Sequence, residues 1–354
     1  MKSTHKRHMA IVGMAVAMVV ASASVGRAEP AKPDELIIRD WPGPWGEAMA
    51  AVGKAFTDKT GIKVQIDKRE DAAVEKLMQA AHAQNREPPV DIMYTMETNS
   101  YRDSAQGLSD PLTTADIPNL SNMLGSAMPD SGQWDYVTIA QDIMTLVYRA
   151  SAFPDGAPDS FTSLFDPKLK GRVYSNAGAE ANVAVVAKLN DWSIPQDMDK
   201  IWSFLETKFA PMNPVLGYDT ELMAGFQRHE VDLALTFPSN AAALKDPDVK
   251  IAMPKEGVYG DGEAFFIPSG LSESRKYWAR QFVNFFLSKE MLTQYCNELT
   301  LACNAKDLPV PPNAGNDPSF PRTPAERDKI FRIPVKTLAE NMATWDAKFN
   351  ALVK

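Results

Sequence analysis

The strongest constraint on the fold is the alternation of strand-like and helix-like segments near the start of the chain. Short apolar segments rich in β-branched residues alternate with amphipathic segments of helical period. In order, they are ELIIRD (35–40), a helix at 46–61 closed by Gly61, IKVQID (62–67), a helix at 72–84, VDIMY (90–94) and a helix ending at Gly107. A β-α-β-α-β-α order predicts a mostly parallel sheet with helices on both faces.

The same alternation resumes after TIAQDIMTLVYR (138–149), a strand-like segment long enough to leave one sheet and enter another. The second series is GRVYSN (171–176), a helix at 179–189, a helix at 198–210, NPVLGY (213–218), a helix at 220–229 and VDLALTF (231–237). Later, Trp278, Phe282, Phe285 and Phe286 form the apolar stripe of an amphipathic helix within 272–290, which we interpret as core packing. We therefore expect two α/β lobes with a ligand cleft between them.

The first 28 residues have the features of a secretory signal. A basic start is followed by an uncharged, largely apolar run from Met9 to about Val25, and Gly26 and Ala28 fit a cleavage site after Ala28. An uncleaved membrane anchor is the alternative, but the run fades into Ala and Ser before it reaches the length of a spanning helix. No cysteine follows it that could carry a lipid. We expect a periplasmic protein with no membrane insertion after cleavage.

The expected mature chain is strongly acidic. Four of the 37 basic residues lie in the signal, which leaves 33 against 45 acidic residues and a net charge of minus 12. Such a chain repels phosphate backbones and anionic lipids, so neither nucleic acid nor a membrane surface is an expected partner.

The chain has two cysteines, Cys296 and Cys303. In an exported chain that otherwise lacks cysteine, this pair predicts a disulfide that closes a short loop. Two buried free thiols are the alternative, because a single helix through both residues would hold the sulfurs too far apart.

Motifs for catalysis, metals and cofactors are missing. His82 and His229 stand alone, so no zinc site is expected, and the chain has no nucleophile elbow, phosphate-binding loop or dinucleotide fingerprint. We expect no cofactor and no metal. The enzyme alternative is a secreted hydrolase in which Asp261 and Glu263, two residues apart on a strand, act as an acid/base pair.

Six segments resemble extracellular solute-binding proteins, in the order in which that family has them. They are KAFTDKTGIKVQI, PVDIMYTMETNSYRDSAQGLSDPL, SFTSLFDPKLKGRVY, HEVDLALTFPSNAAAL, PKEG followed nine residues later by IP, and FVNFFLSKEMLTQY. The PKEG segment is similar to the polyamine-binding branch of the type II periplasmic binding proteins. The resemblance implies a monomer that closes two lobes around a ligand and delivers it to the permease and ATPase of an ABC importer.

The resemblance also implies how the chain divides. Residues 29–140 and 265–310 would form lobe 1, and residues 141–264 and 311–354 would form lobe 2. Two crossover strands would form the hinge, near 141–145 and 262–265.

The same resemblance bears on the ligand. Iron-binding relatives use adjacent tyrosines, which this sequence lacks. Polyamine-binding relatives have Trp-x-Asp where Asp261 and Glu263 stand here, so an acid is kept and an aromatic is lost. Their first tryptophan is kept as Trp41, a second is replaced by Phe237, and two further acids fall on Gly178 and Ala181.

We expect a small amine-containing solute, either polyamine-like or an amino-acid conjugate such as an opine. A sugar, an anion or a thiamine-like solute is the alternative. The strand-to-helix turn at 175–183 could bind a carboxylate end of the ligand through free backbone N–H groups. The candidate ligand-binding residues are Trp41, Trp45, Glu97, Gln141, Asp142, Asn176, Phe237, Ser239, Asp261 and Glu263.

Overall fold

The computed structural model describes residues 29–176, 178–217, 219–315, 317–327 and 329–353. The expected signal at residues 1–28 lies outside this description. The chain divides into residues 1–31 and a compact unit, residues 32–354. In the part that the structure describes, no helix is both long and apolar enough to span a bilayer.

The first expected α/β series is confirmed. Its elements are β1 (Glu35–Arg39), α1 (Pro44–Thr60), β2 (Lys63–Asp67), α2 (Asp71–Ala83), β3 (Ile92–Met96) and α3 (Glu97–Ala105). The central strand β1 pairs in parallel with both β2 and β3. Gly61 ends α1 with a φ of 81°, a left-handed conformation that glycine adopts without steric strain.

The second series is also present. Its elements are β6 (Val173–Asn176), α4 (Glu180–Leu189), α5 (Met198–Phe204), β7 (Val215–Gly217), α6 (Asp219–Gln227), β8 (Leu233–Thr236) and α7 (Pro238–Leu244). The helix expected at 198–210 is regular only to Phe204. A π-helical turn (Leu205–Phe209) and a 3₁₀ turn (Ala210–Met212) follow. Pro211 lies in the 3₁₀ turn, and because it has no N–H group it cannot donate the bond that a regular α-helix would need there.

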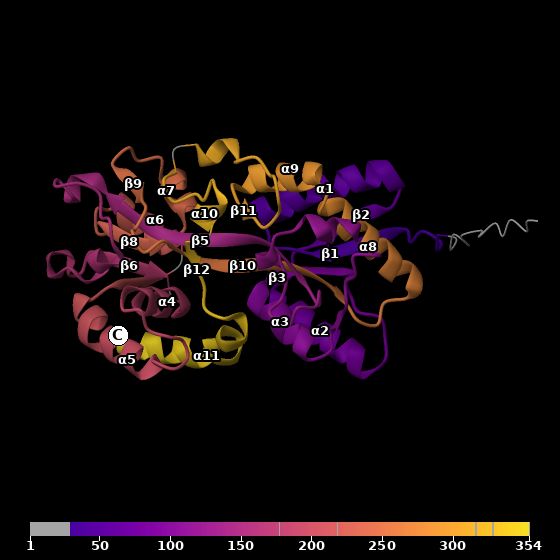
Figure 1. Cartoon of the computed structure of the whole chain (residues 1–354), viewed down its shortest axis with the longest axis horizontal. Helices are drawn as coiled ribbons and strands as arrows, with labels where there is room; N and C mark the ends of the chain where they lie inside the picture. The colour runs from indigo at the N-terminus through magenta and orange to yellow at the C-terminus, as the bar shows by residue number, and fades with distance from the viewer. Residues whose placement is uncertain (1–28, 177, 218, 316, 328, 354) are drawn as a thin grey trace, which may run out of the picture. The chain divides into compact units, whose positions relative to one another are not determined.

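Two long antiparallel strands connect the two series. β5 (Val137–Arg149) and β10 (Val258–Pro268) lie side by side through the middle of Figure 1. β10 also pairs with β3, and β5 also pairs with β8, so that one sheet has the order β2-β1-β3-β10-β5-β8-β6-β7. Four shorter strands pair with the two long ones: β4 (Ser109–Asp110) and β12 (Ile330–Phe331) with β10, and β9 (Val249–Ala252) and β11 (Ala302–Cys303) with β5. This mixed α/β architecture confirms the expected fold class.

Two large apolar cores lie in different parts of the chain. The first combines residues within 36–140 with residues within 265–305, including α8 (Glu273–Phe286) and α9 (Lys289–Leu299). The second combines residues within 144–259 with residues within 333–349, including α11 (Val335–Leu352). We use these two cores to propose the lobe boundaries given above. The short α10 (Pro324–Arg327) precedes β12.

The aromatic stripe packs as expected, but its helix is shorter than predicted. Trp278, Phe282 and Phe286 are buried, and Phe285 packs at the edge of the same core. α8 ends at Phe286, and Ser288 starts α9 by accepting a hydrogen bond from the Met291 backbone N–H at 3.4 Å. A serine at an N-cap favours the start of a new helix over the continuation of the old one.

Cys296 and Cys303 are joined by a disulfide in the structure, with 6.2 Å between their Cα atoms. α9 ends before Cys303, because Thr300 adopts a left-handed conformation with a φ of 57°. The chain turns back there, so the two cysteines do not share one helix.

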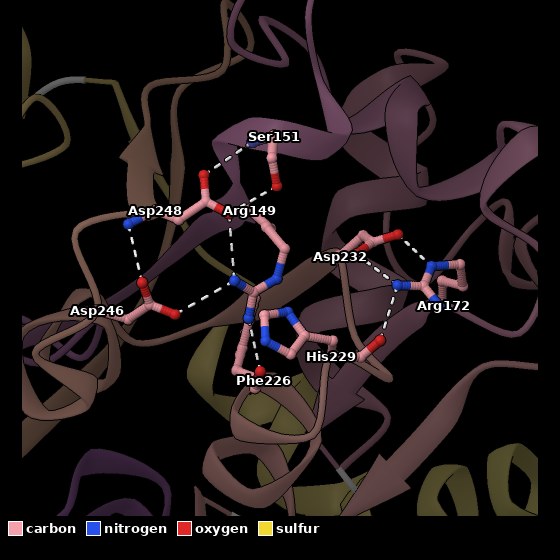
Figure 2. Close-up of polar contacts among 8 residues, drawn as sticks. All are labelled: Arg149, Ser151, Arg172, Phe226, His229, Asp232, Asp246 and Asp248. Carbon is pink, nitrogen blue, oxygen red and sulfur yellow. Dashed lines mark hydrogen bonds and ion pairs between the residues drawn. The ribbon is translucent and has the colours of Figure 1, made fainter.

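A charged cluster fixes the far end of β5 (Figure 2). Arg149, which is 4% exposed, lies 3.2 Å from both Asp246 and Asp248 and donates to the Phe226 carbonyl at 2.6 Å. Asp248 also accepts a hydrogen bond from the Ser151 hydroxyl at 2.6 Å. A buried guanidinium with two carboxylate partners is compensated, so we interpret this cluster as structural.

Candidate ligand site

The site is built on the two long strands. Asp142 of β5 lies directly opposite Asp261 of β10, and Glu263 lies opposite Ala140. Residues opposite each other in an antiparallel pair, and residues two apart on one strand, project from the same face. Three of the predicted carboxylates therefore share a face, whereas Gln141 projects from the other face of β5.

Glu263 is held by donors from two other elements. Its Oε1 accepts a hydrogen bond from Trp45 Nε1 in α1 at 3.0 Å, and its Oε2 accepts one from the Tyr94 hydroxyl in β3. The side chain is 2% exposed. Burial raises the pKa of Glu263, and the two hydrogen bonds oppose that rise.

Trp41 extends the site beyond Glu263. It follows β1, and its ring meets Tyr94 edge to face at 5.3 Å and Trp45 at 6.5 Å between centroids. The Arg39 guanidinium lies 5.1 Å from the centroid of the Trp41 ring. Trp41 and Trp45 are only partly buried, so part of each ring remains accessible.

Asp142 and Asp261 are half-buried acids under mutual repulsion. Burial raises the pKa of Asp142 well above its ordinary value, and the charges of Glu263, Asp261 and Asp219 raise it further. Burial raises the pKa of Asp261 to about 7, with Glu180 adding to the rise. The Gly262 backbone N–H, which donates to Asp261 Oδ1 at 2.8 Å, acts in the opposite direction.

Glu97 has a basic partner, unlike the acids above. It starts α3, is 3% exposed and forms an ion pair with Arg332 at 2.9 Å. A Cβ atom at Gly262 would collide with Glu97 Oε2, so this glycine leaves room for the pair. Glu97 therefore lies on the face of β10 to which a side chain at position 262 would project. Asp142 lies on the opposite face of the strand pair.

The remaining candidates lie on the second series of elements. Phe237 precedes α7 and packs at the edge of the second core, while Ser239 is exposed. Asn176 ends β6, but its side chain is outside the description. The expected anion-binding turn already holds a carboxylate of this chain, because Asp346 of α11 accepts a hydrogen bond from the Ala179 N–H at 2.8 Å.

Two acids and a tyrosine of this site were not predicted from the sequence. Asp40 is fully buried, and its Oδ2 has no hydrogen-bond partner among the described residues. Burial raises its pKa well above the ordinary value, and the charge of Glu263 adds to the rise. Asp219 starts α6 and accepts a hydrogen bond from Asn240 Nδ2 at 2.8 Å. The only sequence feature that pointed to Asp40 was its position at the end of a predicted strand. No sequence feature distinguished Tyr94 from other strand residues.

The arrangement can stabilise a positively charged group and cover it with aromatic rings. A buried ammonium needs a carboxylate partner, and an indole face attracts a cation. Among the described residues, no group of three or more His, Cys, Asp or Glu side chains has the arrangement of a metal site.

Comparison with known proteins defines the class. The chain belongs to the bacterial extracellular solute-binding protein family, whose model matches residues 51–325. A search of curated proteins found no match.

Solved structures share the two-lobe fold at low identity. An ABC transporter substrate-binding protein from Bradyrhizobium japonicum is 16% identical, with a TM-score of 0.75 over 91% of this chain and 100% of that one. The spermidine/putrescine substrate-binding protein PotD from Streptococcus pneumoniae is 17% identical, with a TM-score of 0.73 over 91% and 100%. AgtB from Agrobacterium tumefaciens, in complex with agropinic acid, is 16% identical, with a TM-score of 0.65 over 90% and 98%.

Proposed function

We propose that this protein is the periplasmic solute-binding component of an ABC importer and that its solute is a small amine. The family is one of extracellular solute-binding proteins, and the structural neighbours named above include ABC transporter and spermidine/putrescine-binding proteins. In this proposal the protein hands its ligand to a permease that is driven by an ATPase.

The observation that carries the proposal is the acidic face formed by Asp142, Asp261 and Glu263. The charges that act on the pKa of Asp142 all come from acids and all raise it. Like charges in a partly dry site repel each other, and a bound cation relieves that repulsion. An ammonium group is the simplest ligand with this effect, and the Trp41 and Trp45 rings offer faces for its methylene groups.

The structure favours a plain amine over an amino-acid conjugate. A conjugate or opine needs a second subsite for its carboxylate, and the expected subsite was the turn before α4. The Ala179 N–H of that turn donates to Asp346, so a ligand carboxylate would have to displace it. Glu180 adds a second negative charge there, and its carboxylate lies against Gly178.

A thermal-shift panel tests the solute class. Putrescine and spermidine should raise the unfolding temperature, while glucose, sulfate and succinate should not. Ligand binding at a hundredfold excess over its dissociation constant adds about 2.7 kcal/mol to the free energy of unfolding. Stabilisation by the anions alone would contradict the proposal.

A separate experiment on the ligand that co-purifies with the protein distinguishes binding from hydrolysis. After denaturation, mass spectrometry should recover that ligand chemically unchanged, as expected of a transport receptor. Recovery of a cleaved product would instead support the hydrolase alternative, with Asp261 and Glu263 as its acid and base.

A further inference from the structure

A second cavity lies beside the long strands, away from the acidic face. It has a volume of about 300 Å³ and adjoins a larger pocket of about 560 Å³, with which it shares Ser126 and Arg327. The smaller cavity is lined by Ser126, Gln141, Ala302, Asn304, Arg327, Ile330 and Arg332. It is at the lower end of the size range of small-molecule sites.

Gln141 is the unusual residue in this cavity. Its side chain is 4% exposed, yet neither Nε2 nor Oε1 has a hydrogen-bond partner among the described residues. A buried amide without partners destabilises a fold, so native proteins fill such positions with water or a ligand. Gly260 of β10 keeps the space open, because a Cβ atom there would lie 3.2 Å from Gln141 Oε1 and would collide with Ile330.

Among the described residues, no carboxylate pairs with the positive charge of Arg327. Arg332, the other cation of the cavity, is paired with Glu97. Arg327 donates to the Cys303 carbonyl at 2.5 Å and forms no ion pair with any described residue. Burial lowers the pKa of Arg327, and no charge of a described residue acts in the opposite direction.

Two further polar side chains of the cavity, Asn304 and Ser126, are hydrogen-bonded within the protein. Asn304 Nδ2 donates to the Thr138 carbonyl at 3.2 Å, and Asn304 Oδ1 accepts from the Ser126 hydroxyl at 3.3 Å. The hydrogen-bonding capacity left for a ligand is therefore that of Gln141, Arg327 and the Arg332 N–H groups that do not contact Glu97. It consists of guanidinium and amide donors, together with one amide acceptor.

We propose that this cavity, the Gln141–Arg327 pocket, binds a small hydroxycarboxylate. A carboxylate matches the guanidinium of Arg327, which has no acidic partner among the described residues, and can also accept from Gln141 Nε2. A hydroxyl group matches Gln141 Oε1, which needs a donor. Because Gln141 and Asp142 project from opposite faces of β5, this pocket is separate from the proposed amine site.

Isothermal titration calorimetry with glycerate tests the proposal. The purified protein should bind glycerate at one site, with a dissociation constant on the order of 1 mM for so small a ligand. Acetamide, which lacks the charge, should not bind. Arg327→Gln should weaken glycerate binding at least about tenfold, the value of one charged hydrogen bond, and Arg327→Lys should retain part of the affinity. Gln141→Leu should also weaken it.

Two controls keep the result specific. Arg228→Gln removes an exposed guanidinium that pairs with Glu230, and it should leave glycerate binding unchanged. Glu263→Gln should also leave it unchanged, which separates this pocket from the amine site even if the proposed function fails. The proposal is overturned if the protein does not bind glycerate, if Arg327→Gln binds it as wild type does, or if a glycerate-soaked crystal shows only water at Gln141.

Discussion

Asp142 and Asp261 face each other across the two strands that connect the halves of the sheet. Like charges in directly opposed positions destabilise a strand pair. This repulsion acts where the chain passes between its two apolar cores. A third acid, Glu263, lies beside the pair. A site that binds a cation accounts for the presence of this acidic pair.

Asp142→Asn should stabilise the unliganded protein while it weakens ligand binding. Burial, and then the charges of neighbouring acids, raise the pKa of Asp142. The substitution removes the buried charge and its repulsion, so the free energy of unfolding at pH 8 should rise by about 1 kcal/mol. Urea unfolding measures this change. Asp199→Asn, at an exposed position in α5, is the matched control and should change stability by less than about 0.5 kcal/mol. A destabilised Asp142→Asn variant would argue against repulsion at this site.

The affinity for putrescine should rise with pH up to about pH 8. The pKa of Asp261 is about 7 and those of Asp142 and Glu263 are raised, so these carboxyls are partly protonated at acidic pH. Since an ammonium favours the ionised carboxylates, binding at pH 6 should release protons, and binding at pH 8.5 should release fewer. Each carboxyl that must ionise lowers the affinity by up to about tenfold per pH unit below its pKa.

Calorimetric titrations in buffers of different ionisation enthalpy measure that proton release. Glucose affinity, if any, should not vary with pH in the same way. A putrescine affinity independent of pH between 5.5 and 8 would show that these carboxyls do not meet the ligand.

The order of strands and helices in the two α/β series was predicted well because the signals for it are local. The alternation of ELIIRD, IKVQID and VDIMY with helices depends on spacing within a few residues, and β1, β2 and β3 follow it. The expected start of the crossover at Gln141 and Asp142 also lies within β5. By contrast, α11 and β12 were not predicted, since their positions depend on packing against distant elements.

Within the site, residue type was predictable, but partners and faces were not. Glu263 and Asp261 were found from an acidic cluster beside glycines. The ion pair between Glu97 and Arg332 joins residues more than two hundred positions apart, so no local sequence pattern predicts it. The same holds for the hydrogen bond from the Ala179 N–H to Asp346, which occupies the turn that was expected to bind an anion.

Asp103→Asn should stabilise the protein at neutral and alkaline pH. Asp103 of α3 is 1% exposed, and neither carboxylate oxygen has a partner among the described residues. Burial and the charge of Glu75 raise its pKa to about 7. A raised pKa means that the folded state holds this proton more tightly than the unfolded state, so wild-type stability falls as the pH rises from about 4 to 7.

The neutral asparagine avoids that loss. We expect the free energy of unfolding to increase by about 1 to 3 kcal/mol at pH 8 and by nearly nothing at pH 4, as measured by urea unfolding at both values. An equal change at the two pH values would show that the effect is steric and not electrostatic.

The disulfide should make a modest contribution to stability. The bond between Cys296 and Cys303 closes a short loop, and the loss of chain entropy in the unfolded state is worth about 2 to 3 kcal/mol. The double variant Cys296→Ser, Cys303→Ser should lose that amount in urea unfolding. Exported wild-type protein should resist alkylation until it is reduced, and ready labelling of both cysteines before reduction would contradict the bond.

The most direct measurement of the central claim is a calorimetric titration of putrescine into wild type and Glu263→Gln at pH 8. Glutamine keeps an acceptor for Trp45 or Tyr94 but removes the charge, so the fold should persist while the ammonium loses a partner. We expect saturable binding by wild type and a loss of about 1.5 to 3 kcal/mol in the variant, with unliganded stability nearly unchanged. Equal putrescine affinity in both proteins, or binding of sulfate in its place, would contradict an amine site on this acidic face.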